Sequence, residues 1–248
     1  MKPEDSDVIK VYRKSASAKD FHLMSGNSSI NTTLFVSNEI IRNFPLEADD
    51  LLIDVGCGDG TFLSLVNKKV RNTVGVVTTQ KELLRLEREL PGLRFVVGSA
   101  QNLPFNAHYA NKLVCNSVLL LLDKTNVKKA LEEINRVVTN NGLVYIGEIP
   151  DCQEFTFEKS IVKRGIQRLK MGGFIQFAKL FFGVIMEKFK EGEITRIETH
   201  FFIQPHDFIS LAKENNLKFV SMFRHRTSDK HGDIFEINRW NYIFTKEG

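Results

Sequence analysis

Residues 51–62 read LLIDVGCGDGTF, and this stretch decides the fold that we expect for the chain. An apolar run that contains one acid, Asp54, ends in glycines at alternate positions, and a pattern with helical spacing then begins. Glycine lets the backbone turn tightly and approach a ligand where a Cβ atom would collide. The stretch therefore predicts a strand, a ligand-binding turn at Gly56 and Gly58, and the start of a helix.

The spacing of these glycines does not fit the dinucleotide fingerprint. That fingerprint requires G-x-G-x-x-G, whereas Thr61 occupies the position of the third glycine. A glycine-rich turn taken alone can also be a plain structural turn, so its meaning depends on the segments around it.

Apolar, β-branched runs alternate with helical patterns along the chain. Strand-like runs occupy residues 51–55, 72–77, 93–97, 112–116 and 143–148, and helical spacing occupies residues 62–69, 80–90 and 126–138. This alternation predicts an α/β, doubly wound sheet. A helix near residues 206–215 and strands at 217–223 and 239–245 complete a mixed seven-stranded sheet, for which we expect an antiparallel strand at the edge.

Four segments, in order, resemble motifs of the class I S-adenosylmethionine-dependent methyltransferases of the type 11-like group. The glycine-rich turn resembles the first motif, and residues 98–105, GSAQNLPF, resemble the segment after the third strand. Residues 111–119 and 141–146 resemble the fourth-strand and fifth-strand motifs. The resemblance implies a Rossmann-like methyltransferase fold with N-terminal helices and a helical insertion after the fifth strand. It also implies S-adenosylmethionine as cofactor and S-adenosylhomocysteine as product.

The resemblance further implies a cofactor site at the carboxyl ends of the strands, where the ligands of open parallel sheets lie. Asp54 would fix the amino group of the methionine part, and Gly56 and Gly58 would pack against the methionine part and the ribose. The cofactor-binding residues that we expect are Asp54, Gly56, Cys57, Gly58, Thr78, Gln80, Ser99, Ala100, Gln101, Asn116 and Ser117. No metal site is expected, because the cysteines show neither paired spacing nor a zinc pattern.

Two positions depart from the family's pattern. An acid commonly ends the second strand and binds both ribose hydroxyls, whereas this chain has Val77 there, and Ser99 replaces the usual acid near adenine. A ribose hydroxyl left without an acceptor costs about 1 to 3 kcal/mol, or about one to two powers of ten in affinity. Thr78, Thr79 or Gln80 could compensate, as in cyclopropane synthases, which look similar in lacking this acid.

Methyl transfer is an in-line displacement at a sulfonium, so the protein mainly aligns the nucleophile and excludes water. An acceptor that is a hydroxyl or an ammonium also requires a base. Glu148, at the end of the fifth strand, is the predicted catalytic residue, and His22 and His206 are further candidates. Glu148 could instead be a loop-capping carboxylate, and each histidine a surface or packing residue.

A basic, phenylalanine-rich stretch follows Pro150. Residues 159–190 carry eight basic side chains and one acid, and a broad apolar face predicts a helix. It is either a lid packed on the sheet or a flap that contacts a hydrophobic, sugar or lipid-linked acceptor, with its basic residues at a membrane surface. The expected domains are an N-terminal helical cover at 1–45, a core at 46–150 and 200–248, and the insertion at 151–199.

The sequence also limits the classes of partner and location. The amino-terminal residues lack the apolar core of a signal peptide, and no run reaches the ~18 apolar residues of a membrane span, so we expect a cytoplasmic protein with peripheral membrane contact. The expected partner is a small-molecule methyl acceptor. Nucleic-acid modification ranks last, because residues 116–119 read NSVL in place of a base-clamping motif. The alternative is a noncatalytic methyltransferase-fold binding protein that acts through the basic insertion. The oligomeric state stays open.

Overall fold

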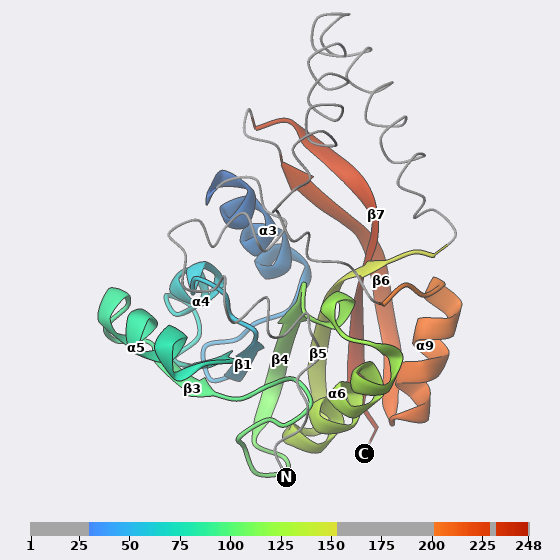
Figure 1. The fold of residues 1–248 in the computed structure, drawn as a ribbon, viewed down its shortest axis with the longest axis horizontal. Helices are drawn as coiled ribbons and strands as arrows, with labels where there is room; N and C mark the ends of the chain where they lie inside the picture. Colours follow the sequence, from blue (N-terminus) through green and yellow to red (C-terminus); the bar gives the residue numbers. More distant parts are fainter. Residues whose placement is uncertain (1–29, 153–200, 229–231, 248) are drawn as a thin grey trace, which may run out of the picture.

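The computed structural model describes residues 30–152, 201–228 and 232–247, which form a mixed sheet with helices on both faces (Figure 1). The seven strands lie in the order β3-β2-β1-β4-β5-β7-β6. Their bounds are β1 Leu51–Val55, β2 Asn72–Val77, β3 Arg94–Val97, β4 Ala110–Asn116, β5 Val138–Pro150, β6 Leu217–Ser228 and β7 Ile234–Lys246. The first five strands pair in parallel, so their carboxyl ends meet on one side of the sheet. The predicted doubly wound, seven-stranded sheet is confirmed.

The expected position of the antiparallel strand is wrong. β7 runs antiparallel to both neighbours, but it lies between β5 and β6, and β6 forms the edge. The burial pattern gives the reason. Consecutive residues of β7, from Asn241 to Phe244, are buried, as suits a strand covered on both faces, whereas Val220 and Met222 of β6 are exposed.

Helices cover the two faces unequally (Figure 1). One face carries α3 Ile30–Asn43, α4 Thr61–Val66 and α5 Gln80–Glu89, and the other carries α6 Lys124–Val137 and α9 Pro205–Glu214, with the short η1 Leu119–Leu121 after β4. Successive residues of a strand point to opposite faces. Accordingly, Leu52 joins the cluster of α3 and α4, and Ile53 joins that of α6 and α9.

The local sequence of α6 explains why this helix could be predicted. Its N-cap, Asp123, accepts a hydrogen bond from the backbone of Asn126, which satisfies one of the free amides of the first turn. Val127, Ala130 and Ile134 lie at helical spacing and are fully buried. The predicted apolar face is therefore the one that packs on the sheet.

The insertion predicted at 151–199 lies outside the described residues, apart from Asp151 and Cys152. The chain that flanks it is described: the amide of Ile203 donates to the carbonyl of Pro150 at 3.2 Å. The described residues that flank the insertion on both sides therefore lie near the carboxyl end of β5. Of the expected N-terminal cover, only α3 and the residues after it are described. Among helices in the described ranges, none is long and apolar enough to cross a membrane.

Candidate functional site

The glycine-rich turn folds across the end of β2. The amides of Gly56 and Cys57 both donate to the carbonyl of Val76, at 3.0 and 3.2 Å. Gly56 and Gly58 have φ of 72° and 59°, in the left-handed region that favours glycine. A Cβ added at Gly56 would lie 2.6 Å from Val118 Cγ2. The turn therefore sits closely between the ends of β2 and β4, as the predicted tight turn requires.

Asp54 is a buried carboxyl group beside this turn. It is 5% exposed, and no hydrogen bond or ion pair joins its carboxyl to another residue in the described part of the chain. Burial and, to a lesser extent, the nearby charge of Asp59 together raise the pKa of Asp54 to about 7. A cation placed against this carboxyl would favour its charged form, so the group fits a ligand ammonium.

At the end of β2, the threonine hydroxyls that could compensate for the missing acid are hydrogen-bonded within the protein. Val77 is 3% exposed and packs in the core. The hydroxyls of Thr78 and Thr79 each donate to Glu82 Oε2 at 2.9 Å, so neither donates to a ligand in this arrangement. Gln80 begins α5 and is exposed. The sequence analysis did not single out Glu82, although its capping-box spacing from Thr79 was a local signal.

The end of β3 lies against the end of β2. The amide of Gly98 donates to the carbonyl of Val77 at 2.8 Å, and Ser99 and Asn102 exchange backbone hydrogen bonds in a tight turn. Ala100 is buried within this turn, whereas Ser99 and Gln101 are half-buried. The predicted adenine-side residues therefore lie in the turn after β3, and this turn and the glycine-rich turn both contact the end of β2.

Two residues at the ends of β4 and β5 have left-handed backbones without being glycine. Ser117 has φ 59° and Glu148 has φ 64°. Such conformations cost about 1 to 3 kcal/mol and cluster at functional sites. The β5–β7 register shifts between Ile146 and Ile149, so Glu148 lies in a β-bulge, a device that redirects a side chain.

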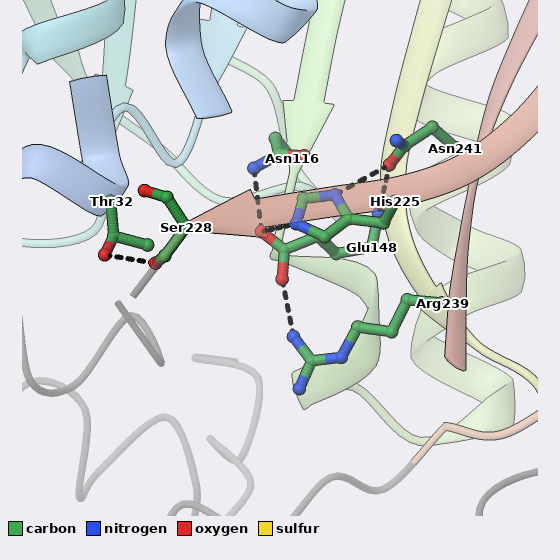
Figure 2. A network of polar contacts seen from close by, with 7 residues as sticks. All are labelled: Thr32, Asn116, Glu148, His225, Ser228, Arg239 and Asn241. Carbon is green, nitrogen blue, oxygen red and sulfur yellow. Dashed lines mark hydrogen bonds and ion pairs between the residues drawn. The ribbon is translucent and has the colours of Figure 1, made fainter. Parts of the chain in front are cut away.

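Glu148 is the centre of a buried polar network (Figure 2). Its Oε2 accepts a hydrogen bond from Arg239 Nη1, and its Oε1 accepts one from Asn116 Nδ2 at 3.2 Å. His225 Nε2 lies 3.9 Å from the same Oε1. Burial alone would raise the pKa of Glu148, but the charges of His225 and Arg239 and the hydrogen bonds from Arg239 and Asn116 outweigh it, so the pKa is lowered.

The position of the proton on His225 follows from Asn241. Asn241 Oδ1 accepts the backbone amide of Glu148 at 3.0 Å, so it is the amide oxygen and not the nitrogen. His225 Nδ1 lies 3.3 Å from the same oxygen and must therefore carry the hydrogen. Burial lowers the pKa of His225, although Glu148 favours its charged form.

The structure brings some predicted residues together and leaves others apart. Asp54, the glycine-rich turn, Asn116 and Glu148 share the carboxyl side of the sheet. His206 lies on α9 with its side chain 90% exposed and pairs with Asp207, so it does not join Glu148. His22 lies outside the described residues. Sequence reasoning missed His225, Arg239 and Asn241, whose only signal is that they are polar residues within strand-like runs.

Within the described ranges, no group of three or more His, Cys, Asp or Glu residues could hold a metal ion. The described residues instead offer a carboxyl without a partner among them, Asp54, a turn with glycines at alternate positions and a buried polar network around Glu148. These features suit an organic ligand that carries an ammonium group.

Comparisons with known proteins identify the domain. Residues 53–146 match the model of a family described as a methyltransferase domain. An uncharacterised protein of Methanocaldococcus jannaschii is 28% identical over 168 residues, which are 67% of this chain and 61% of that relative. The chain spans less than two thirds of the curated relatives that it matches, namely 61%, 44% and 41% of their lengths.

Solved structures share the fold. An S-adenosylmethionine-dependent methyltransferase of Methanosarcina mazei superposes with a TM-score of 0.56 at 19% identity, over 84% of this chain and 97% of that one. The N-methyltransferase NodS of Bradyrhizobium japonicum, in complex with S-adenosylhomocysteine, gives 0.58 at 11% identity, over 98% and 100%. The matched domain, the strand order and the glycine-rich turn after β1 together show that the chain has the class I methyltransferase fold, with a methyltransferase domain at residues 53–146.

Proposed function

We propose that this chain transfers the methyl group of S-adenosylmethionine to a small-molecule acceptor and releases S-adenosylhomocysteine. The observation that carries the proposal is the Asp54 carboxyl, which is buried beside the glycine-rich turn without a cation from the described residues. A buried carboxyl of this kind is costly unless a positive partner is bound. The ammonium of the methionine part is such a partner.

The rest of the site fits the same cofactor. Gly56 and Gly58 offer backbone without Cβ atoms, so the methionine part and ribose can approach closely. Ser99 and Ala100 lie on the side proposed for adenine. The NodS structure holds S-adenosylhomocysteine, which supports the same class of ligand here. When bound, the sulfonium supplies an activated methyl group and its own leaving group.

We propose a positioning role for Glu148 in place of a base. Both of its oxygens already accept hydrogen bonds, and its pKa is lowered, so it takes up a proton poorly at neutral pH. It holds the side chain of Asn116 at the end of β4 and is itself held by Arg239. The base roles of His22 and His206 remain predictions from the sequence.

The proposed class of acceptor is inferred from the composition of the insertion. Its basic and phenylalanine-rich composition favours a hydrophobic or lipid-linked acceptor, with residues 159–190 in contact with an anionic membrane surface. The insertion leaves and rejoins the core at the carboxyl end of β5, the side on which Asn116 and Glu148 lie.

Transfer of a labelled methyl group tests the proposal. The purified chain is incubated with labelled S-adenosylmethionine and, in separate reactions, with small-molecule nucleophiles, lipid-linked acceptors, RNA and protein. We expect label in a small-molecule or lipid-linked fraction, and its loss in Asp54→Asn. Label in RNA or protein contradicts the proposed acceptor class. Binding of the cofactor without transfer to any class favours the noncatalytic alternative.

A further inference from the structure

The end of β2 lacks an acid, yet the structure places one there from another element. Val77, the last residue of the strand, is buried in the cluster that contains Cys57 and Leu86, so it contributes nothing polar to a ligand. Glu82 belongs to the first turn of α5, and its side chain reaches back to the residues that follow Val77. The carboxylate therefore belongs to a residue five positions after Val77, but it lies at the end of the same strand.

Four hydrogen bonds fix the carboxylate of Glu82. Its Oε2 accepts from the amides of Thr78 and Thr79, at 3.2 and 2.9 Å. The same oxygen accepts from both threonine hydroxyls at 2.9 Å. Glu82 is only 4% exposed, so the group is held rigidly and not as a solvated surface charge. Charge-assisted hydrogen bonds of this kind are strong.

The second oxygen of this carboxylate is left available. No hydrogen bond to Glu82 Oε1 and no ion pair to Glu82 occurs within the described ranges, although this oxygen is also a hydrogen-bond acceptor. Oε1 is also not one of the fully buried side-chain atoms that lack a partner in the described residues, so this oxygen is accessible to solvent or to a ligand. Oε1 is therefore the candidate acceptor for a ligand hydroxyl.

The surroundings of Glu82 are those of the cofactor site. The glycine-rich turn donates from Gly56 and Cys57 to Val76, and the β3 turn donates from Gly98 to Val77, so both turns flank the end of β2. Burial raises the pKa of the Cys57 thiol, and the charges of Asp54 and then Glu82 raise it further. Both carboxylates therefore act on the same turn.

We infer that Glu82 supplies the ribose-binding carboxylate that β2 lacks, with Oε1 accepting hydrogen bonds from the ribose hydroxyls and Thr78 and Thr79 holding Oε2. The inference rests on the proposed function, because it concerns the same cofactor. In this arrangement a carboxylate from α5 compensates for the acid that is missing at Val77. The threonines then act as positioning residues behind Glu82 and do not themselves contact the ribose.

The competing role is a helix cap alone. Thr79 and Glu82 form a capping box, in which Gln serves as well as Glu. In Glu82→Gln the four donors would select the amide oxygen, so the amide NH₂, which accepts no hydrogen bond, would replace Oε1. The substitution therefore keeps the cap and removes the acceptor that the ribose requires.

The experiment is calorimetric titration of the wild type and Glu82→Gln with S-adenosylhomocysteine and with its 2′-deoxy and 3′-deoxy analogues. In the wild type we expect loss of a hydroxyl to weaken binding about 10- to 100-fold. In Glu82→Gln we expect binding of the parent ligand about 10-fold weaker or more, and a deoxy penalty below about threefold. Asp123→Asn, which alters the N-cap carboxylate of α6, is the matched control and should keep the full penalty.

Each outcome decides a separate question. A wild type that does not bind S-adenosylhomocysteine overturns the proposed function. A wild type that binds the parent and both deoxy forms equally overturns the role of Glu82 without any variant, even when Glu82→Gln does not fold. If removal of a ribose hydroxyl weakens binding equally in wild type and Glu82→Gln, Glu82 acts only as a helix cap.

Discussion

The carboxylate of Glu148 accepts a hydrogen bond from the guanidinium of Arg239, which lies 91 residues further along the chain. The pair joins the bulge of β5 to the antiparallel strand β7, and the side chains are 4% and 20% exposed. A buried carboxylate in a left-handed bulge is unfavourable alone, so Arg239 holds the end of β5 in shape.

Arg239→Met should lower the free energy of unfolding by about 3 kcal/mol, because it leaves Glu148 buried without its cation. Urea denaturation measures the change. Arg42→Ala is the control, since Arg42 pairs with Glu39 while 67% exposed, and it should cost less than about 1 kcal/mol. Equal losses in the two variants would show that Arg239 is an ordinary surface residue.

Glu148 should also give the folded state a defined acid sensitivity. Its pKa is lowered in the folded protein, so the unfolded chain binds this proton first as the pH falls. The contribution is therefore complete above pH ~4.5 and is lost below it, as the pH falls through the folded pKa. The free energy of unfolding, measured between pH 3 and 6, should fall more steeply in wild type than in Glu148→Gln. Parallel curves would contradict a lowered pKa.

Asp54 should release a proton when the ligand binds. With its pKa raised to about 7, the carboxyl is mostly protonated at pH 6, whereas an ammonium selects the charged form. We expect release of about 0.9 proton per S-adenosylhomocysteine bound at pH 6. Calorimetry at pH 6 in two buffers of different ionisation enthalpy measures this number. Asp54→Asn should abolish the release and weaken binding about 10- to 100-fold. Identical heats of binding in the two buffers would refute this role.

Asn241 should be more important for folding than an exposed asparagine. Its side-chain oxygen accepts from the Glu148 amide and from His225, and Asn241 is 2% exposed. Asn241→Leu leaves both donors unpaired, so we expect unfolding to become easier by about 2 to 4 kcal/mol. Asn38→Leu, which removes an exposed contact on α3, should change it by about 0.5 kcal/mol or less. Thermal and urea unfolding of the two variants compare them, and a neutral Asn241→Leu would argue against the network.

Much of the fold could be predicted because its signals are local. The apolar runs and helical spacing located the strands and helices, and the acid and glycines of residues 51–62 located the first turn. The position of β7 in the sheet could not be predicted from its local sequence. It depends on whether β6 or β7 is the strand that is buried on both of its faces. β7 has the continuous buried run from Asn241 to Phe244, and β6 does not.

The candidate site residues that the sequence indicated are those at the ends of strand-like runs, such as Asp54, Asn116 and Glu148. Asp54 and the glycines belong to a single turn. Glu82 was missed because its role depends on the bend of a side chain back to Thr78, and His225 because bulges in two strands direct it toward Glu148. Polar contacts that require register across strands have no periodic signature.

The most direct measurement is calorimetric titration of the purified chain with S-adenosylmethionine and S-adenosylhomocysteine, with NAD as the control. We predict saturable micromolar binding of both methyl-cycle ligands and none of NAD. Gly58→Val should abolish binding, because the branched side chain occupies a left-handed position in the turn, whereas Gly92→Val, strained at φ 108° outside the site, should retain it. Absence of binding by the wild type, or unchanged binding by Gly58→Val, would contradict a cofactor site at this turn.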